Sequence, residues 1–315
     1  MQPIKLTNSK SNDQLIYFTS RCVTTDNKFL IFLSDRTGHP NIFSLDLHSR
    51  EEKQLTFNQE GFLRSYQYFR GNNYRGLGKA SISLDSDNGL IYYLQGRHIC
   101  CVNLNGENKI LAKYPGKQMT AYTHVSSDGT RLCVPTVDER AFQEDKSKGW
   151  RPAHNIDKRI QEEHLSSYLH IYDTSTGEHI SSEKVSKAWI THVQFCPKNK
   201  DIILYNHEWP SSNPGERRLW IWDGIKHKKI RNISDEISKQ DWVCHEMWSQ
   251  DGESIIYHGQ HKDGPHFIGK INFPENETIE IDMPENFYEY GHFTIGKTGM
   301  LVSDGYYRSP NLSKM

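Results

Sequence analysis

The chain has 315 residues and a formal net charge of -1, with 38 Lys and Arg against 39 Asp and Glu. This balance argues against a nucleic-acid partner or an anionic membrane surface. No stretch approaches the roughly 20 apolar residues that span a bilayer, and residues 1–14 lack the apolar segment of a signal peptide. We therefore expect a soluble, cytoplasmic protein. An aromatic share of 11% fits many short, half-buried strands.

A short unit recurs along the chain: a strand, a polar turn centred on Asp, Asn or Gly, and an apolar strand. Asp-Gly and Asn-Gly pairs tolerate the positive φ that tight hairpin turns need. Because repeats decide an architecture, six similar turns are the strongest fold signal in this sequence. The turns lie near residues 26–27, 87–88, 128–129, 197–200, 251–252 and 296–299.

Most units continue with a second hairpin, as Asn41–Asp46 and His98–Asn103 do in the first two. Four strands per unit, repeated every 40 to 70 residues or so, predict the blades of a β-propeller. A β-sandwich is the competing interpretation, but it does not need the same turn in register six times. We expect one all-β domain over residues 1–315, with about six units and the last incomplete. In the second unit, the adjacent Cys100 and Cys101 should face opposite sides of a strand, one inward and one outward.

One segment breaks the pattern. Residues 143–167 are polar and charged, and residues 155–165 predict a short helix between the second and third strands of the third unit. Such an insertion on one face of a propeller either shapes a binding site or is a solvated decoration.

Histidines recur at one offset on the strands expected to line a propeller's central channel. His192, His245 and His292 each lie about six residues before a turn, and His124 lies two residues later, on the same strand face. Local packing explains a lone histidine better than it explains three in register. Convergent imidazoles suit a divalent transition metal or acid–base chemistry near neutral pH.

Other polar groups are expected near the same end. His207 follows a strand of the fourth unit, and Arg218 precedes the next one. Arginine presents a planar fork that matches a carboxylate, although a solvated surface charge explains it equally well. Glu246 alternates to the other face from His245, so we expect it to be structural. The remaining histidines, His258 among them, carry no predicted chemistry.

The blade pattern with Ser34–Arg36 and Asn41–Leu47 resembles TolB-type propeller repeats. From about Tyr17 to Gly305 the chain more specifically resembles the oligogalacturonate lyases of polysaccharide lyase family 22. The stretches that carry this resemblance are His207–Pro210, Arg218–Trp220, Cys244–Trp248, Gly291–His292 and Val302–Gly305.

The resemblance implies a seven-bladed propeller that cleaves short, often unsaturated, oligogalacturonides by β-elimination in the bacterial cytoplasm during pectin degradation. It also implies a bound divalent cation, commonly manganese. By position in the motifs, His292 would be a metal ligand, His245 the base and Arg218 the carboxylate-binding or charge-stabilising group. His192 and His207 would line the substrate pocket.

The sequence departs from the family at its end. Family members continue into a last blade whose Gln and His-Pro-His residues complete the metal site, whereas no His-x-His follows His292 here. The resemblance therefore implies one family ligand instead of four, and a ring that can lack its closing strands. An open ring would leave unpaired edges, across which we expect a homodimer. The alternative to a lyase is a non-catalytic propeller that binds sugar or protein.

Overall fold

The computed structural model describes residues 4–59, 80–149, 156–208, 218–234 and 241–284, together with short stretches at 287–288, 291–296, 298–303 and 306–307. The chain divides into two compact units, Met1–Val193 and Gln194–Met315. Regular structure in the described residues is almost entirely β. Within them, no helix has the length and apolar character needed to cross a membrane.

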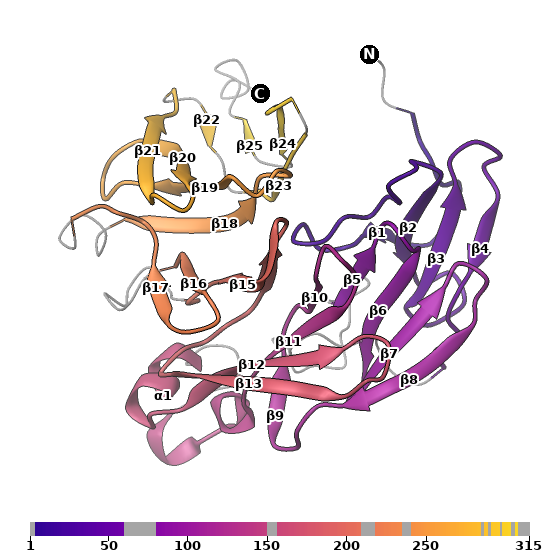
Figure 1. Cartoon of the computed structure of the whole chain (residues 1–315), viewed down its shortest axis with the longest axis horizontal. Coiled ribbons are helices and arrows are strands. Elements are labelled where there is room, and N and C mark those ends of the chain that lie inside the picture. The colour runs from indigo at the N-terminus through magenta and orange to yellow at the C-terminus, as the bar shows by residue number, and fades with distance from the viewer. Residues whose placement is uncertain are drawn as a thin grey trace. The chain divides into compact units, whose positions relative to one another are not determined.

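The first unit contains three antiparallel sheets whose strands follow one another in chain order, side by side in Figure 1. The first sheet is β1 (Asp13–Leu15), β2 (Phe29–Ser34), β3 (Asn41–Asp46) and β4 (Glu52–Gln54). The second is β5 (Ile82–Asp85), β6 (Leu90–Gln95), β7 (His98–Asn103) and β8 (Asn108–Lys113). The third is β10 (His124–Val125), β11 (Arg131–Asp138), β12 (Ser166–Asp173) and β13 (His179–Ser186), with β9 (Gln118–Thr120) pairing with β11.

The predicted turns lie where the repeat places them. Asn27, Gly89, Gly129 and Gly252 have φ values of 56°, 64°, 71° and 67°. Positive φ is routine for glycine and tolerated by asparagine, which explains why these residue types recur at the hairpins.

Both faces of the second sheet are covered. Tyr93 and Cys100 pack with the apolar residues of the first sheet, while Tyr92 and Cys101 pack with those of the third. The two cysteines face opposite sides as expected, but both are buried. The expectation that one would face outward was wrong, because this sheet lies between two others instead of at a surface.

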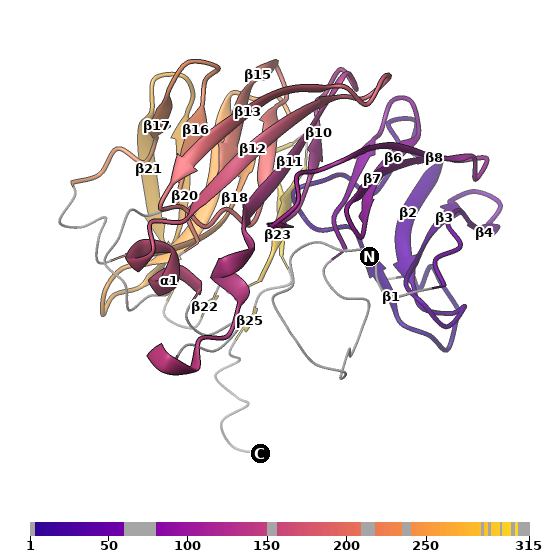
Figure 2. The ribbon, with the colours of Figure 1, turned by 90° about the horizontal axis from the view of Figure 1, so that it is seen from below.

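The insertion between β11 and β12 contains η1 (Glu139–Phe142), η2 (Lys146–Lys148) and α1 (Ile156–Glu162). Ile156 and Ile160, one helical turn apart, pack with Phe142, Leu165 and Trp189 in a small core of their own. Figure 2 shows α1 beyond the ends of β11 and β12. The segment is therefore a packed extension of the third sheet.

The second unit contains two further four-stranded antiparallel sheets and a smaller sixth element. The fourth sheet is β14 (Val193–Cys196), β15 (Asn199–Tyr205), β16 (Trp220–Trp222) and β17 (His227–Lys229). The fifth is β18 (Trp242–Trp248), β19 (Ser254–Gln260), β20 (His266–Asn272) and β21 (Glu277–Asp282). The sixth element comprises two strand pairs, β22 (Phe287–Tyr288) with β25 (Tyr306–Tyr307) and β23 (Phe293–Ile295) with β24 (Leu301–Ser303).

A core of aliphatic and aromatic side chains joins the fourth and fifth sheets. Leu219, Ile221 and Ile230 from one side meet Val243 and Tyr257 from the other. Fully burying a side chain of this size contributes about 1.5–3 kcal/mol. The packing fixes the strand ends of both sheets, and these ends carry the polar groups described next.

Candidate functional site

The site begins at an irregularity in β18. Cys244 pairs with His258 and Met247 pairs with Ile256, so two residues, His245 and Glu246, oppose Tyr257 alone. This is a β-bulge, and its first residue, His245, has φ 51°. Glycine usually occupies such a position because other residues are strained there. A histidine in this conformation within a strand makes His245 a candidate functional residue.

A side chain from the neighbouring sheet supports the bulge. Gln194 on β14 is buried; its Nε2 donates to the Glu246 carbonyl at 2.7 Å, and its Oε1 accepts from the Trp248 N–H at 3.3 Å. Because β18 is the edge strand of the fifth sheet, alternate backbone groups point away from β19, and these two bonds satisfy two of them next to the bulge.

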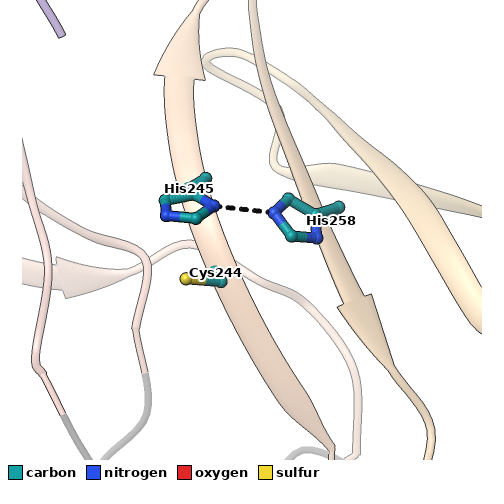
Figure 3. Close-up of side chains that lie close together, drawn as sticks. All are labelled: Cys244, His245 and His258. Carbon is teal, nitrogen blue, oxygen red and sulfur yellow. Dashed lines mark hydrogen bonds between the residues drawn. The ribbon is translucent and has the colours of Figure 1, made fainter. Parts of the chain in front are cut away.

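The bulge brings three side chains together (Figure 3). In a regular strand Cys244 and His245 would face opposite sides, but here both lie beside His258 of β19. His245 Nδ1 is 2.9 Å from His258 Nε2, and ligand atoms of all three residues lie within 4.8 Å of one another. Burial raises the pKa of the Cys244 thiol to about 11, although Arg218 opposes the shift, so the thiol is neutral near pH 7.

His292 lies next to this group, directly before β23. Its ring centroid is 4.4 Å from that of His245, with the two planes 43° apart. Two of the histidines predicted to converge therefore do so, although they come from different strands and one stands on a bulge.

Arg218, two residues before β16, bonds to the same group from the fourth sheet. Its side chain is 7% exposed; Nη1 donates to Cys244 Sγ at 2.9 Å and Nη2 to Glu208 Oε2 at 2.7 Å. Its Nε lies 3.5 Å from Oε2 of the fully buried Glu246. One guanidinium thus lies between two carboxylates, which excludes the interpretation of Arg218 as a solvated surface charge.

The backbone beside Arg218 is also strained. Leu219 has φ 76°, a value that bulky residues rarely adopt. Leu219 is fully buried in the core between the two sheets, which holds it in place. Strained residues persist only where the surrounding structure over-determines them, and they cluster at functional sites.

His207 follows β15 and precedes Glu208. Its ring lies 5.0 Å from Trp220 and 5.8 Å from Tyr205, centroid to centroid. Burial lowers the pKa of His207 to about 3, and His227 adds to the effect, so the imidazole is neutral near pH 7. The structure surrounds His207 with aromatic rings, and its assignment to the substrate pocket stays a prediction.

His192 and His124 belong to the first unit. His192 is buried directly before β14, with its ring 6.0 Å from Tyr17 and 5.7 Å from Phe18. Tyr17 stacks on Tyr122 at 3.7 Å. Burial lowers the pKa of His124 to about 4. The role of His192 toward a substrate also stays a prediction.

Sequence reasoning missed His258 and left out Glu208 as a partner of Arg218. The signal for His258 was its pairing: a regular ladder counted back from the turn at 251–252 places His258 opposite His245, and the bulge shifts its partner to Cys244. Glu246, expected to be structural, is buried and forms an ion pair with Arg218. Both residues depend on a bulge that residue alternation cannot reveal.

The donor set was tested against manganese, the ion that the resemblance implies. Manganese favours carboxylate, carbonyl and water oxygens, whereas Cys244, His245 and His258 offer a neutral thiol and two imidazoles in direct contact. These three do not form a manganese cage. The half-buried imidazole of His292 fits as a single ligand.

Five blade-type sheets in chain order, with a sixth smaller element, define an all-β propeller protein. A model of the oligogalacturonate lyase family matches residues 1–282, and the chain belongs to that family. Among curated proteins, none matches this chain.

Solved structures support the fold. An oligogalacturonate lyase in complex with manganese is 22% identical, with a TM-score of 0.74 over 96% of this chain and 74% of that one. An oligogalacturonate lyase from Vibrio parahaemolyticus is also 22% identical, with a TM-score of 0.74 over 95% and 73% of the two chains. A TolB protein from Agrobacterium tumefaciens is 10% identical, with a TM-score of 0.50 over 88% and 84%.

Proposed function

We propose that this chain cleaves short oligogalacturonides, unsaturated dimers among them, by β-elimination. The observation that carries the proposal is the strained His245, in contact with His292 and next to Cys244, the thiol that Arg218 contacts. We place the reaction in the cytoplasm, where the sequence predicts the chain to reside.

The chemistry requires removal of a weakly acidic proton. His245 takes the proton at C5 of the uronate, the electron pair forms a C4–C5 double bond, and the bond from C4 to the glycosidic oxygen breaks. The leaving oxygen takes up a proton, so the products together have the mass of the substrate. A positioned imidazole contributes roughly 10²–10⁴-fold to such a transfer.

Negative charge develops on the carboxylate side of the uronate as the proton leaves. Arg218 supplies a positive charge that is already oriented and largely shielded from water, where it stabilises more than it would in solvent. A divalent cation held in part by His292 would add Lewis-acid stabilisation of the same carboxylate.

The test is an assay on digalacturonate and unsaturated digalacturonate with manganese supplied. From digalacturonate we expect galacturonate and a 4,5-unsaturated uronate detected by its ultraviolet absorbance, and from unsaturated digalacturonate two unsaturated uronates. In both cases the product masses sum to that of the substrate. Digalacturonate with its carboxylates reduced to alcohols should not react. Products heavier than the substrate by one water would indicate hydrolysis and contradict the proposal.

The role of His292 is tested by calorimetric titration of manganese into the full chain. We expect binding to weaken or disappear in His292→Ala. His261→Ala is the matched control, because His261 belongs to a second acidic group in which Arg231 already occupies the centre. Equal binding by both variants would contradict a role for His292.

A non-catalytic carbohydrate-binding function is the second candidate. The two carboxylates already paired with Arg218 favour it. Glu208 and Glu246 already neutralise the guanidinium that a substrate carboxylate would need. This candidate predicts saturable calorimetric binding of digalacturonate with no unsaturated product at any manganese concentration.

A further inference from the structure

His258 has no part in the chemistry described so far, yet its position is specific. Its side chain is buried in the middle of β19, and its Nε2 lies 2.9 Å from Nδ1 of His245 (Figure 3). The bulge gives His258 the ladder partner Cys244 and at the same time places the ring of His245 beside it.

We propose that His258 is a positioning residue that holds His245 in the one tautomer able to accept the substrate's proton. The inference rests on the proposed function, because it assigns a partner to the base named there.

A hydrogen bond between two neutral imidazoles contains one proton, and its direction decides what His245 can do. If His245 Nδ1 donates to His258 Nε2, then Nε2 of His245 carries a lone pair and can act as a base. If His258 donates instead, His245 carries its proton on Nε2 and cannot accept another there. A general base is commonly oriented by a third group in this way.

Donation from His245 Nδ1 to His258 Nε2 also suits the imidazolium that forms when His245 accepts the proton. When a proton moves from C5 to Nε2 of His245, the Nδ1–H of the new imidazolium still donates to the lone pair of His258 Nε2. No group has to rotate during the transfer, and preorganisation of this kind lowers the barrier.

The surroundings of His258 fix its ring. Trp242 meets it edge-on at 5.5 Å between centroids, and Phe293 does so at 6.0 Å. The Phe293 contact comes from the residue after His292, so the base and the predicted metal ligand share one packed support.

The kinetic test compares two substitutions at position 258. His258→Phe keeps a ring between Trp242 and Phe293 but removes the acceptor, and we expect kcat to fall roughly 10–100-fold with KM nearly unchanged. His258→Gln keeps an acceptor at about the place of Nε2, and we expect it to recover most of kcat. His266→Phe, at another buried histidine of the same sheet, is the control for ring replacement and should leave kcat unchanged.

Wild-type kcat in His258→Phe, or an equal loss in His258→Phe and His258→Gln, would overturn the proposal. Nitrogen-15 spectroscopy of the full chain without paramagnetic metal tests it independently of turnover. The His245 signals, identified by their disappearance in His245→Gln, should show a protonated Nδ1 and an unprotonated Nε2 near neutral pH. A protonated Nε2 in the neutral ring would overturn the tautomer assignment even if the chain had no lyase activity, whereas an inactive chain with the expected tautomer would contradict only the proposed function.

Discussion

Two arginines of the second unit are buried between carboxylates, and only one of them belongs to the candidate site. Arg231 donates from Nη2 to Asp241 at 2.5 Å and to Glu280 at 3.1 Å, and from Nε to Glu280 at 2.8 Å. Arg218 contacts Glu208, Glu246 and a thiol. A buried arginine with two acidic partners is therefore not by itself a sign of function.

The surroundings separate the two. Arg231 lies 5.9 Å and 5.4 Å from the ring centroids of Tyr257 and Phe267, which belong to regular strands, and Tyr257 donates to Glu280 at 2.5 Å. Burial opposes the charge of Arg231, but the bonds to Glu280 and Asp241 raise its pKa above the usual arginine value. Arg218 instead lies among backbone with positive φ, next to imidazoles, with a partner, Glu208, whose side chain is 32% exposed. Positive φ in the adjoining backbone and a solvent-accessible partner distinguish the candidate pair of Arg218 and Glu208 from the structural pair of Arg231 and Asp241.

Tyr257 and His258 are neighbours on β19, so their side chains leave on opposite faces of the fifth sheet. One face carries the Arg231 group and the other carries the contact with His245. The Arg231 group and the contact between His245 and His258 therefore lie on opposite faces of the fifth sheet, and substitutions in them should have separable effects.

The largest expected effect is on stability. Arg231→Leu leaves Asp241 and Glu280 without their cation, and removal of one partner of a buried ion pair typically costs about 3–5 kcal/mol. We expect the free energy of unfolding in urea to fall by that amount, with kcat per folded molecule unchanged. A loss of kcat in the folded protein would break the distinction between the two arginines.

Arg218→Lys should lower activity and leave stability nearly unchanged, the reverse of Arg231→Leu. Lysine keeps a positive charge between Glu208 and Glu246 but not the planar fork, so we expect little loss of stability. Loss of a positioned charge stabiliser commonly costs about 2.7–4 kcal/mol of barrier, so kcat/KM on digalacturonate should fall roughly 100–1000-fold. An unfolding free energy as low as that of Arg231→Leu, with kcat/KM intact, would reverse the two roles.

Lowering the pH should change the stability contribution of His207 but not that of Arg231. Because the pKa of His207 is about 3 in the folded chain and 6.5 is its ordinary value, the unfolded chain takes up a proton that the folded chain does not between these pH values. Stability is thus lost as pH falls from about 6.5 toward 3, by up to about 1.4 kcal/mol per pH unit for this group. His207→Phe should lose less stability between pH 6.5 and 4 than wild type does. Arg231 stays charged throughout and contributes no slope, so an unchanged acid slope in His207→Phe would contradict the buried, neutral state of His207.

The smallest effect concerns Glu208. Its half-exposed carboxylate occupies the fork that a substrate carboxylate would use, and a pair of this exposure contributes about 1 kcal/mol, roughly fivefold in affinity. Glu208→Gln should therefore lower KM for digalacturonate by about that factor. Glu280→Gln, the counterpart beside Arg231, should leave KM unchanged. A raised KM in Glu208→Gln would mean that Glu208 helps to bind substrate.

The sequence predicts the fold correctly where a backbone conformation requires a particular residue type, such as Asn or Gly at a turn with positive φ. Asn27, Gly89, Gly129 and Gly252 lie at the hairpins that their types predict, and the blade repeat follows from them. The sequence also singled out Arg218, His245 and His292; the structure places Arg218 against Cys244 and His292 against His245, and their roles stay predictions.

The contacts of His258 and Glu246 could not be predicted, because they depend on the register between β18 and β19. Regular pairing from the turn at 251–252 gives His258 the partner His245, and alternation assigns Glu246 to the face opposite His245. Neither predicts the change of partner to Cys244, because nothing in the residues from Cys244 to Met247 signals one extra residue in the strand. A bulge with histidine in place of glycine has no sequence signature. Glu208 was hidden for a related reason, since its partner Arg218 is ten positions away along the chain.

The bulge also determines how easily the proposed chemistry could be lost in evolution. Deletion of a single residue between Cys244 and Met247 would restore a regular ladder with β19, because only one residue, Tyr257, lies opposite. The sheet and its core would keep their pairing, while the contact between the two histidines would disappear. A fold of this kind can therefore persist in descendants that have lost the reaction, and one codon in β18 separates the two outcomes.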